Sequence, residues 1–131
     1  MIICHINSKR EAVMSLMVCG AADETHEIQA IIDTGYSGFL TLPTAMITAL
    51  GLSSIGTEQL TLADGSEVVS AVCPATIVWD GQLRAIEVDT LESDALVGMA
   101  LMDGYDLNMH ITVGGQVTLT SFAPTVPPAT S

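Results

Sequence analysis

Basic residues are scarce in this sequence of 131 residues. Lysine and arginine together number 3, against 15 aspartate and glutamate residues, which gives a formal net charge of −12 at pH 7. Such a charge repels the phosphate groups of nucleic acids and of anionic membranes, so the sequence predicts neither partner. We interpret the acidic excess as a source of solubility, and attraction to basic peptides is the alternative.

Long apolar runs and paired cysteines are also missing. No apolar run reaches the roughly 18 to 20 residues of a membrane-spanning helix. Residues 1–5 do not resemble the start of a signal peptide, so we expect a cytoplasmic protein. The 3 cysteines form no Cys-x-x-Cys pair, which favours reduced thiols. Cys4, His5 and Cys19 match no zinc-ligand spacing, so the sequence predicts no metal and no cofactor.

Short apolar segments separated by turn residues run through most of the chain. They predict strands at residues 11–20, 27–32, 39–42, 58–62, 68–72, 75–79, 83–88, 96–97, 106–113 and 116–120. Evenly spaced short strands are typical of an all-β barrel or sandwich, and the length fits a single domain over residues 1–120. Two short helices are expected, at residues 43–50 with Thr44 as cap, and at residues 99–102.

The remaining segments predict loops and ends. Asp-Gly pairs at residues 64–65 and 80–81 predict two-residue hairpin turns, because both residue types tolerate the positive φ that such turns need. Residues 89–94 predict an acidic loop, and residues 1–10 predict no regular element. Residues 121–131 are rich in Pro, Thr, Ala and Ser, which predicts a flexible tail.

A cluster of polar residues follows a strand that is expected to be buried. Ile31 and Ile32 lead into Asp33-Thr34-Gly35-Tyr36-Ser37-Gly38, and apolar residues resume directly afterwards. An ionised carboxylate at the end of a buried strand is costly without hydrogen-bond donors. Thr34, Ser37 and the backbone around Gly35 are the candidate donors. A carboxyl group held in this way is a candidate catalytic acid or base, and an ordinary Asp-capped β-turn is the alternative.

A second element, Ala95-Leu96-Val97-Gly98-Met99, lies downstream. Two motifs of these types, in this order and at this separation, resemble the retropepsin-like aspartic proteases, and in particular their small single-domain bacterial members. The resemblance extends over residues 11–120. It implies a retropepsin-like closed barrel or sandwich with one Asp-Thr-Gly lobe per chain.

The resemblance also implies roles for individual residues. Asp33 would be the catalytic carboxylate, Thr34 would bond across to a second subunit, and Gly35 would admit the substrate. Leu96, Val97 and Gly98 would pack beneath the turn, and the hairpin with its tip at Ala63, Asp64 and Gly65 would be the flap over the substrate. The implied substrate-binding residues are Tyr36, Ser37, Ala63, Asp64, Gly65, Leu96, Val97 and Gly98.

One Asp-Thr-Gly motif per chain has a consequence for the assembly. Hydrolysis of an amide needs one group to deprotonate water and another to protonate or polarise the carbonyl oxygen. The resemblance therefore implies a homodimer in which two Asp33 residues act on a peptide or unfolded protein. Met99 replaces an arginine that braces retroviral dimers, and Tyr36 replaces a small residue. A dimeric peptide-binding module without catalysis, and a monomeric structural domain, are the alternatives.

Overall fold

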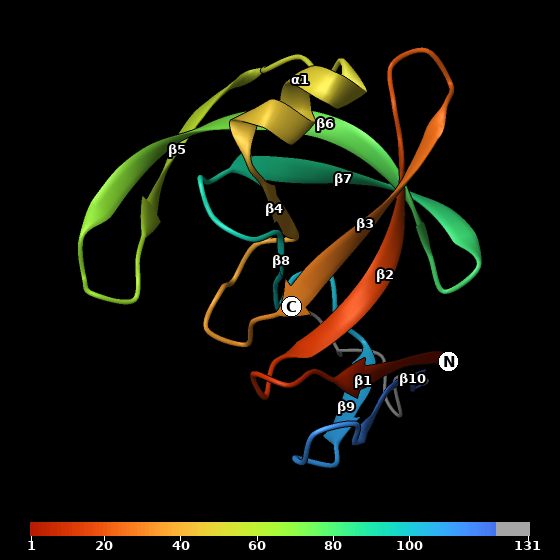
Figure 1. The fold of residues 1–131 in the computed structure, drawn as a ribbon. Helices are drawn as coiled ribbons and strands as arrows, with labels where there is room; N and C mark the ends of the chain where they lie inside the picture. Colours follow the sequence, from red (N-terminus) through yellow and green to blue (C-terminus); the bar gives the residue numbers. More distant parts are fainter. Residues whose placement is uncertain (123–131) are drawn as a thin grey trace, which may run out of the picture.

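The protein is described by a computed structural model that covers residues 1–122 (Figure 1). Those residues form ten strands and one helix. The strands in chain order are β1 (Ile2–Ile6), β2 (Ala12–Cys19), β3 (Thr25–Ile32), β4 (Leu40–Leu42), β5 (Gly56–Thr61), β6 (Glu67–Trp79), β7 (Gln82–Thr90), β8 (Leu96–Val97), β9 (Tyr105–Met109) and β10 (Gln116–Ser121). The helix α1 (Thr44–Leu50) lies between β4 and β5. Residues 123–131, which make up most of the predicted tail, lie outside the described residues.

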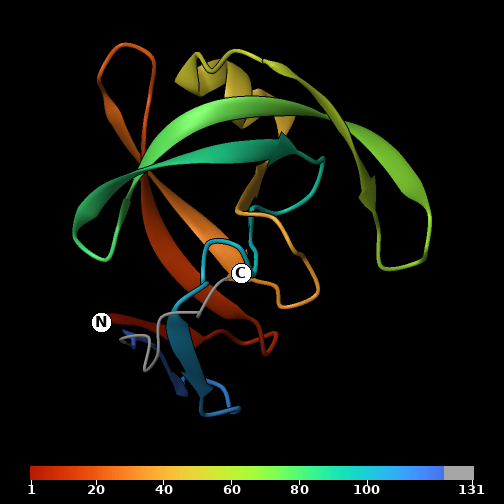
Figure 2. The same ribbon diagram turned by 180° about the vertical axis from the view of Figure 1, so that it is seen from behind.

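All ten strands belong to one sheet in the order β5-β6-β7-β4-β8-β3-β2-β1-β10-β9. A further antiparallel pairing joins β6 to β2, with Val18 opposite Ile77. This pairing closes the strands β6, β7, β4, β8, β3 and β2 into a ring. Figures 1 and 2 show β1, β9 and β10 grouped at one end of the molecule, away from α1.

One cluster of buried apolar side chains joins the strands of this ring to β1 and β10. Along β2, residues at every second position are almost fully buried, which is the period of two expected of a strand with one inward face. The deepest apolar side chains come from β2, β3, β4, β6, β7, β8, β10 and the segment after β8. Those with an exposed fraction of 0% are Val18, Ala30, Leu40, Leu42, Ile77, Val88, Val97, Leu101 and Val117.

Helix α1 begins differently from the prediction. Its N-cap residue is Pro43, which contributes no side-chain cap, and Thr44 is the first helical residue. The N–H of Thr44 donates to Oε1 of Glu92 at 2.8 Å, and its hydroxyl donates to the same oxygen. These bonds lower the pKa of the Glu92 carboxyl, with the hydroxyl bond as the larger cause. Gly51 ends the helix with φ of 69°, as predicted.

Strand β6 is one continuous strand where the sequence predicts two, separated by Cys73 and Pro74. Proline lacks an N–H and therefore usually interrupts a sheet. Here β5 stops pairing with β6 at Val72, and β2 starts pairing at Thr76. Pro74 lies between these two points and pairs only with Glu87 of β7, so its missing donor disrupts no second ladder.

Three other predictions near the ends of the chain are wrong. Residues 1–10 contain β1, whose Cys4 and Ile6 are buried between β2 and β10. Residues 99–102 form hydrogen-bonded turns and no continuous helix: the N–H of Met102 donates to the carbonyl of Gly98 at 3.3 Å, and the N–H groups of Met99 and Ala100 donate to carbonyls of the 33–39 segment. The strand predicted at 106–113 ends at Met109, because residues 110–115 turn back on themselves.

The two Asp-Gly hairpins differ in geometry. Asp80 and Gly81 both have positive φ, 51° and 81°, and form the predicted two-residue turn. At the other hairpin only Gly65 has positive φ, 86°, and five residues separate Thr61 from its partner Glu67. The prediction of a two-residue turn is therefore wrong at Asp64.

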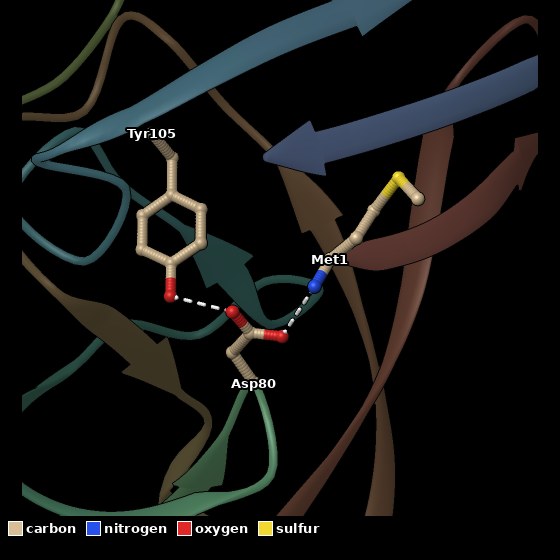
Figure 3. Close-up of polar contacts among 3 residues, drawn as sticks. All are labelled: Met1, Asp80 and Tyr105. Carbon is tan, nitrogen blue, oxygen red and sulfur yellow. Dashed lines mark hydrogen bonds and ion pairs between the residues drawn. The ribbon is translucent and has the colours of Figure 1, made fainter. Parts of the chain in front are cut away.

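Asp80 connects the β6–β7 turn to two other strands (Figure 3). Its carboxylate accepts a hydrogen bond from the Met1 ammonium at 2.8 Å and from the Tyr105 hydroxyl at 2.9 Å. The bond from the ammonium is the first cause that lowers the pKa of Asp80, and the bond from Tyr105 adds to it. The ring of Tyr105 also packs edge-on against Trp79, with centroids 5.6 Å apart.

Within residues 1–122, no helix is long and apolar enough to cross a membrane.

Candidate active site

The segment from residue 33 to residue 39 connects β3 to β4, and these two strands flank β8 in the sheet. Strand β8 runs parallel to β3, with Ile32 opposite Val97, and antiparallel to β4, with Leu40 opposite Val97. We call residues 33–39 the catalytic turn, a name that refers to the role proposed for Asp33 below. Because Ile32, Leu40 and Val97 are all buried, the turn starts and ends on the core. Figures 1 and 2 show it projecting from the ring on the side toward which the β5–β6 hairpin extends.

Asp33 is held at the first position of this turn. Its N–H donates to the carbonyl of Val97 at 2.9 Å, which continues the parallel ladder beyond the end of β3. Its Oδ1 accepts the N–H of Gly35 at 2.9 Å. Of the predicted donors, Gly35 is confirmed, whereas the hydroxyls of Thr34 and Ser37 bond to no group of the described chain. The Asp33 side chain is partly exposed, so its carboxylate is accessible to solvent.

The segment after β8 packs against the catalytic turn and donates backbone hydrogen bonds to it. The N–H groups of residues 98, 99 and 100 donate to the carbonyls of Phe39, Tyr36 and Gly38 at 3.0, 2.8 and 3.1 Å. Gly98 is buried against the turn, and a Cβ there would lie 2.2 Å from the Gly38 carbonyl oxygen. Only glycine allows this approach. Val97 and Gly98 bond to Asp33 and Phe39 at the two ends of the turn. Leu96 pairs with Ile31 and Thr41 outside the turn, and a role of these residues toward a substrate stays a prediction.

Tyr36 places its side chain against the β7 strand. Its hydroxyl donates to Oδ2 of Asp89 at 2.5 Å, and Asp89 is only 5% exposed. Burial raises the pKa of Tyr36 most, and the hydrogen bond and negative charge of Asp89 raise it further. The charge of Asp89 is also the first cause that raises the pKa of Glu58 on β5.

Sequence reasoning missed Asp89 and Glu58. The prediction assigned Asp89 to an acidic loop, but it is the penultimate residue of β7 and pairs with Thr41 and Val72. Its position directly after the buried Val88 was the available signal, the same signal that singled out Asp33. Glu58 lies on an exposed strand and gave no signal.

The hairpin tip is separate from the turn. Ala63, Asp64 and Gly65 are exposed at the end of β5 and β6. Oδ1 of Asp64 accepts the hydroxyl of Ser66 at 2.6 Å and its N–H at 2.9 Å, and these bonds lower the pKa of Asp64. Asp64 therefore stabilises the bend of the tip.

A cavity of about 520 Å³ lies elsewhere on the surface, between the β2–β3 turn and the end of α1. Cys19, Gly51 and Ile55 are among the residues that line it, and none of the predicted site residues does. In a single chain, Thr34, Gly35 and Ser37 are instead exposed on an open turn. The described chain thus presents a carboxylate on a braced, accessible turn.

Comparison with known proteins identifies the fold. No protein-family model matches the sequence, and no curated protein does either. A retropepsin-like aspartic protease from Rickettsia conorii has a TM-score of 0.60 at 18% identity, over 93% of this chain and 91% of that chain. The EIAV protease in complex with the inhibitor HBY-793 has a TM-score of 0.57 at 17% identity, over 73% of this chain and 88% of that chain.

The foamy viral protease-reverse transcriptase, solved with an RNA/DNA hybrid, has a TM-score of 0.51 at 19% identity. The match covers 72% of this chain and 12% of that much longer chain. These likenesses show that the chain has an all-β, retropepsin-like fold, as the sequence predicted.

Proposed function

We propose that the protein is an aspartic endopeptidase in which Asp33 activates the water that attacks a peptide bond. The observation that carries the proposal is the position of Asp33 directly after the buried Ile32 at the end of β3, in a braced turn of a retropepsin-like fold. A carboxylate so placed is a general base of fixed geometry. Because the carboxylate is accessible, water and substrate can reach it.

A second carboxyl group completes the chemistry. One carboxylate takes a proton from water, while a protonated partner donates to the carbonyl oxygen, and two carboxyls held close together share a single proton for this purpose. Each chain carries one Asp-Thr-Gly motif. We therefore propose a C₂ homodimer in which Asp33 of each subunit faces the axis, and the two carboxyls titrate as a pair.

The remaining site residues serve the substrate in this proposal. The exposed Thr34 and Ser37 are available to a second subunit and to a peptide. The β5–β6 hairpin, with Ala63, Asp64 and Gly65 at its tip, closes over an extended peptide or unfolded protein and excludes water. No metal or cofactor takes part in the reaction.

The test is digestion of a peptide library across about pH 4 to 8, with new termini identified by mass spectrometry. Asp33→Asn removes the general base but keeps the size of the side chain, so we expect a folded dimer without cleavage. Asp94→Asn, at an exposed position of the acidic loop, is the matched control and retains cleavage. Cleavage by Asp33→Asn at the wild-type rate would contradict the mechanism.

A dimeric peptide-binding module is the second candidate function. Met99, at the position of the retroviral arginine, is half exposed, and Asp64 holds the hairpin tip in a bend of its own. Both observations favour a dimer whose interface and hairpin tip differ from those of the retroviral enzymes. A wild-type dimer that binds library peptides without releasing products at any pH would support this function over catalysis.

A further inference from the structure

One buried carboxylate has no part in the mechanism above. Asp89 on β7 is 5% exposed, and no ion pair in the described chain includes it. Its bond from the Tyr36 hydroxyl, at 2.5 Å, links positions 53 residues apart. A buried charge is costly unless a good hydrogen bond compensates it. The hydrogen bond that offsets the cost of burying Asp89 therefore comes from a residue of the catalytic turn.

The ring of Tyr36 is enclosed by two glycines. A Cβ at Gly38 would lie 2.3 Å from the Tyr36 hydroxyl oxygen, and a Cβ at Gly98 would lie 2.5 Å from its Cδ2. The ring therefore fills space that side chains at these two positions would occupy. One of the glycines belongs to the turn itself and the other to the segment that supports it.

The backbone of Tyr36 is fixed as well. Its N–H donates to the carbonyl of Asp33 at 3.2 Å, and its carbonyl accepts the N–H of Met99 at 2.8 Å. Tyr36 is thus bonded to Asp33 at one end and to Asp89 at the other. A movement of the tyrosine ring would be transmitted to Asp33 through a single turn of backbone.

We propose that Tyr36 and Asp89 are a positioning pair, which anchors the catalytic turn to β7 and thereby fixes the Asp33 carboxylate. This role rests on the proposed function. In this role the pair acts through the geometry of the turn. Small displacements of a catalytic group lower rates steeply, so an anchor three residues from Asp33 is expected to affect kcat more than KM.

The groups around the pair keep Tyr36 a hydrogen-bond donor. Glu58 of β5 and Glu87 of β7 are the other acidic groups whose charges act on this cluster. Burial and the neighbouring carboxylates raise the pKa of Tyr36, so its hydroxyl stays protonated at any pH at which the enzyme would work. The anchor therefore persists across the digestion range.

The test compares four variants by steady-state kinetics on a cleaved library peptide. Tyr36→Phe and Asp89→Leu each remove one partner, and we expect kcat to fall about 10- to 100-fold with little change in KM. Asp89→Asn keeps an oxygen acceptor for the hydroxyl and retains most of the activity. Asp94→Asn, at an exposed position of the acidic loop, is the control and stays at the wild-type rate.

The double variant Tyr36→Phe/Asp89→Leu separates positioning from stability. Tyr36→Phe alone leaves the buried Asp89 without its hydrogen-bond donor, whereas the double variant removes Asp89 as well. We therefore expect the melting temperature of the double variant to lie closer to that of the wild type than that of Tyr36→Phe does. Its kcat should remain low, because the anchor is still missing. Recovery of kcat together with stability, or wild-type kcat in the single variants, would overturn the proposal.

Amide hydrogen exchange tests the pair independently of catalysis. Tyr36→Phe should speed exchange at Gly35, whose N–H bonds to Asp33, by at least about tenfold, and leave β2 unchanged. Unchanged exchange in the catalytic turn would overturn the positioning role even in an active enzyme. If the wild type cuts no peptide, the proposed function fails, and accelerated exchange would still establish the anchor.

Discussion

The catalytic turn and the β5–β6 hairpin extend to the same side of the protein, and they are held in different ways (Figures 1 and 2). The turn begins and ends on buried residues and receives backbone hydrogen bonds from the segment after β8. Five of the six residues of β5 are exposed, and the strand pairs only with β6. Val69 on the facing part of β6 is 69% exposed.

In the proposed function, this difference assigns rigidity to the turn and mobility to the hairpin. A catalytic carboxylate needs a fixed position relative to its partner, whereas a flap needs to open and admit a peptide. Segments with few buried apolar contacts open at low free-energy cost. The protein combines a turn that is coupled to the core with a hairpin that depends mainly on its own ladder.

Equal truncations in the two regions should have very different effects. Leu40→Ala removes a side chain with 0% exposure at the end of the catalytic turn, and we expect a loss of about 2–5 kcal/mol in the free energy of unfolding. Leu60→Ala on β5, where the side chain is partly exposed, should cost less than about 1 kcal/mol. Urea denaturation measures both, and similar losses would show that the hairpin belongs to the core.

Glycine substitutions test the same comparison through close packing. Gly98→Ala places a Cβ 2.2 Å from the Gly38 carbonyl oxygen, so backbone must move, and we expect destabilisation of about 1–3 kcal/mol. A Cβ at Gly56 on β5 meets no atom of the described chain within 4 Å. Gly56→Ala should therefore be neutral or stabilising by up to about 1 kcal/mol. Thermal unfolding distinguishes them, and a harmless Gly98→Ala would contradict the tight turn.

A local change at the hairpin tip should remain local. Asp64→Ala removes the acceptor of both bonds from Ser66, so the amide of Ser66 should exchange several-fold faster. Because the tip is exposed, the melting temperature should not change. Asp64→Asn retains an oxygen acceptor and serves as the control. A lower melting temperature for Asp64→Ala would show that the tip supports the core.

The parts of the structure that follow from local sequence were predictable. Short apolar segments between turn residues identified the strands of the ring, except that β6 was predicted as two strands, and Gly51 marked the end of α1. The buried strand that leads into Asp33 predicted the catalytic turn, and the apolar pair before Gly98 predicted its support. These features depend on side chains within a few residues of one another, where periodicity and turn chemistry are informative.

The parts that depend on distant pairing were not predictable. Pro74 is tolerated within β6 only because β5 ends before it and β2 joins after it. The partner of Tyr36 lies on β7, and neither residue indicates the other in the sequence. Thr44 is of a residue type that often caps helices, but the backbone N–H at the start of α1 is bonded by Glu92 from a distant loop. Each of these outcomes is decided by tertiary neighbours.

The smallest predicted effect concerns the charge at the base of the hairpin. The negative charge of Asp89 raises the pKa of Glu58 above its ordinary value, with burial as the second cause. The native state therefore binds this proton more tightly than the unfolded chain does. The resulting stabilisation is complete below the unfolded pKa of about 4.3 and is lost as pH rises through the native value.

Glu58 on β5 and Asp89 on β7 are acidic groups on the two sides of β6, and the charge of Asp89 acts unfavourably on that of Glu58. Glu58→Gln removes one of them and should stabilise the protein at pH 7 by a few tenths of a kcal/mol, because Glu58 is exposed and screened by solvent. Below about pH 4 the same variant should melt like the wild type. Glu67→Gln, which removes a carboxylate at the other end of the hairpin, is the matched control. Equal shifts at both pH values would mean that packing, and not charge, sets how firmly the hairpin base is held.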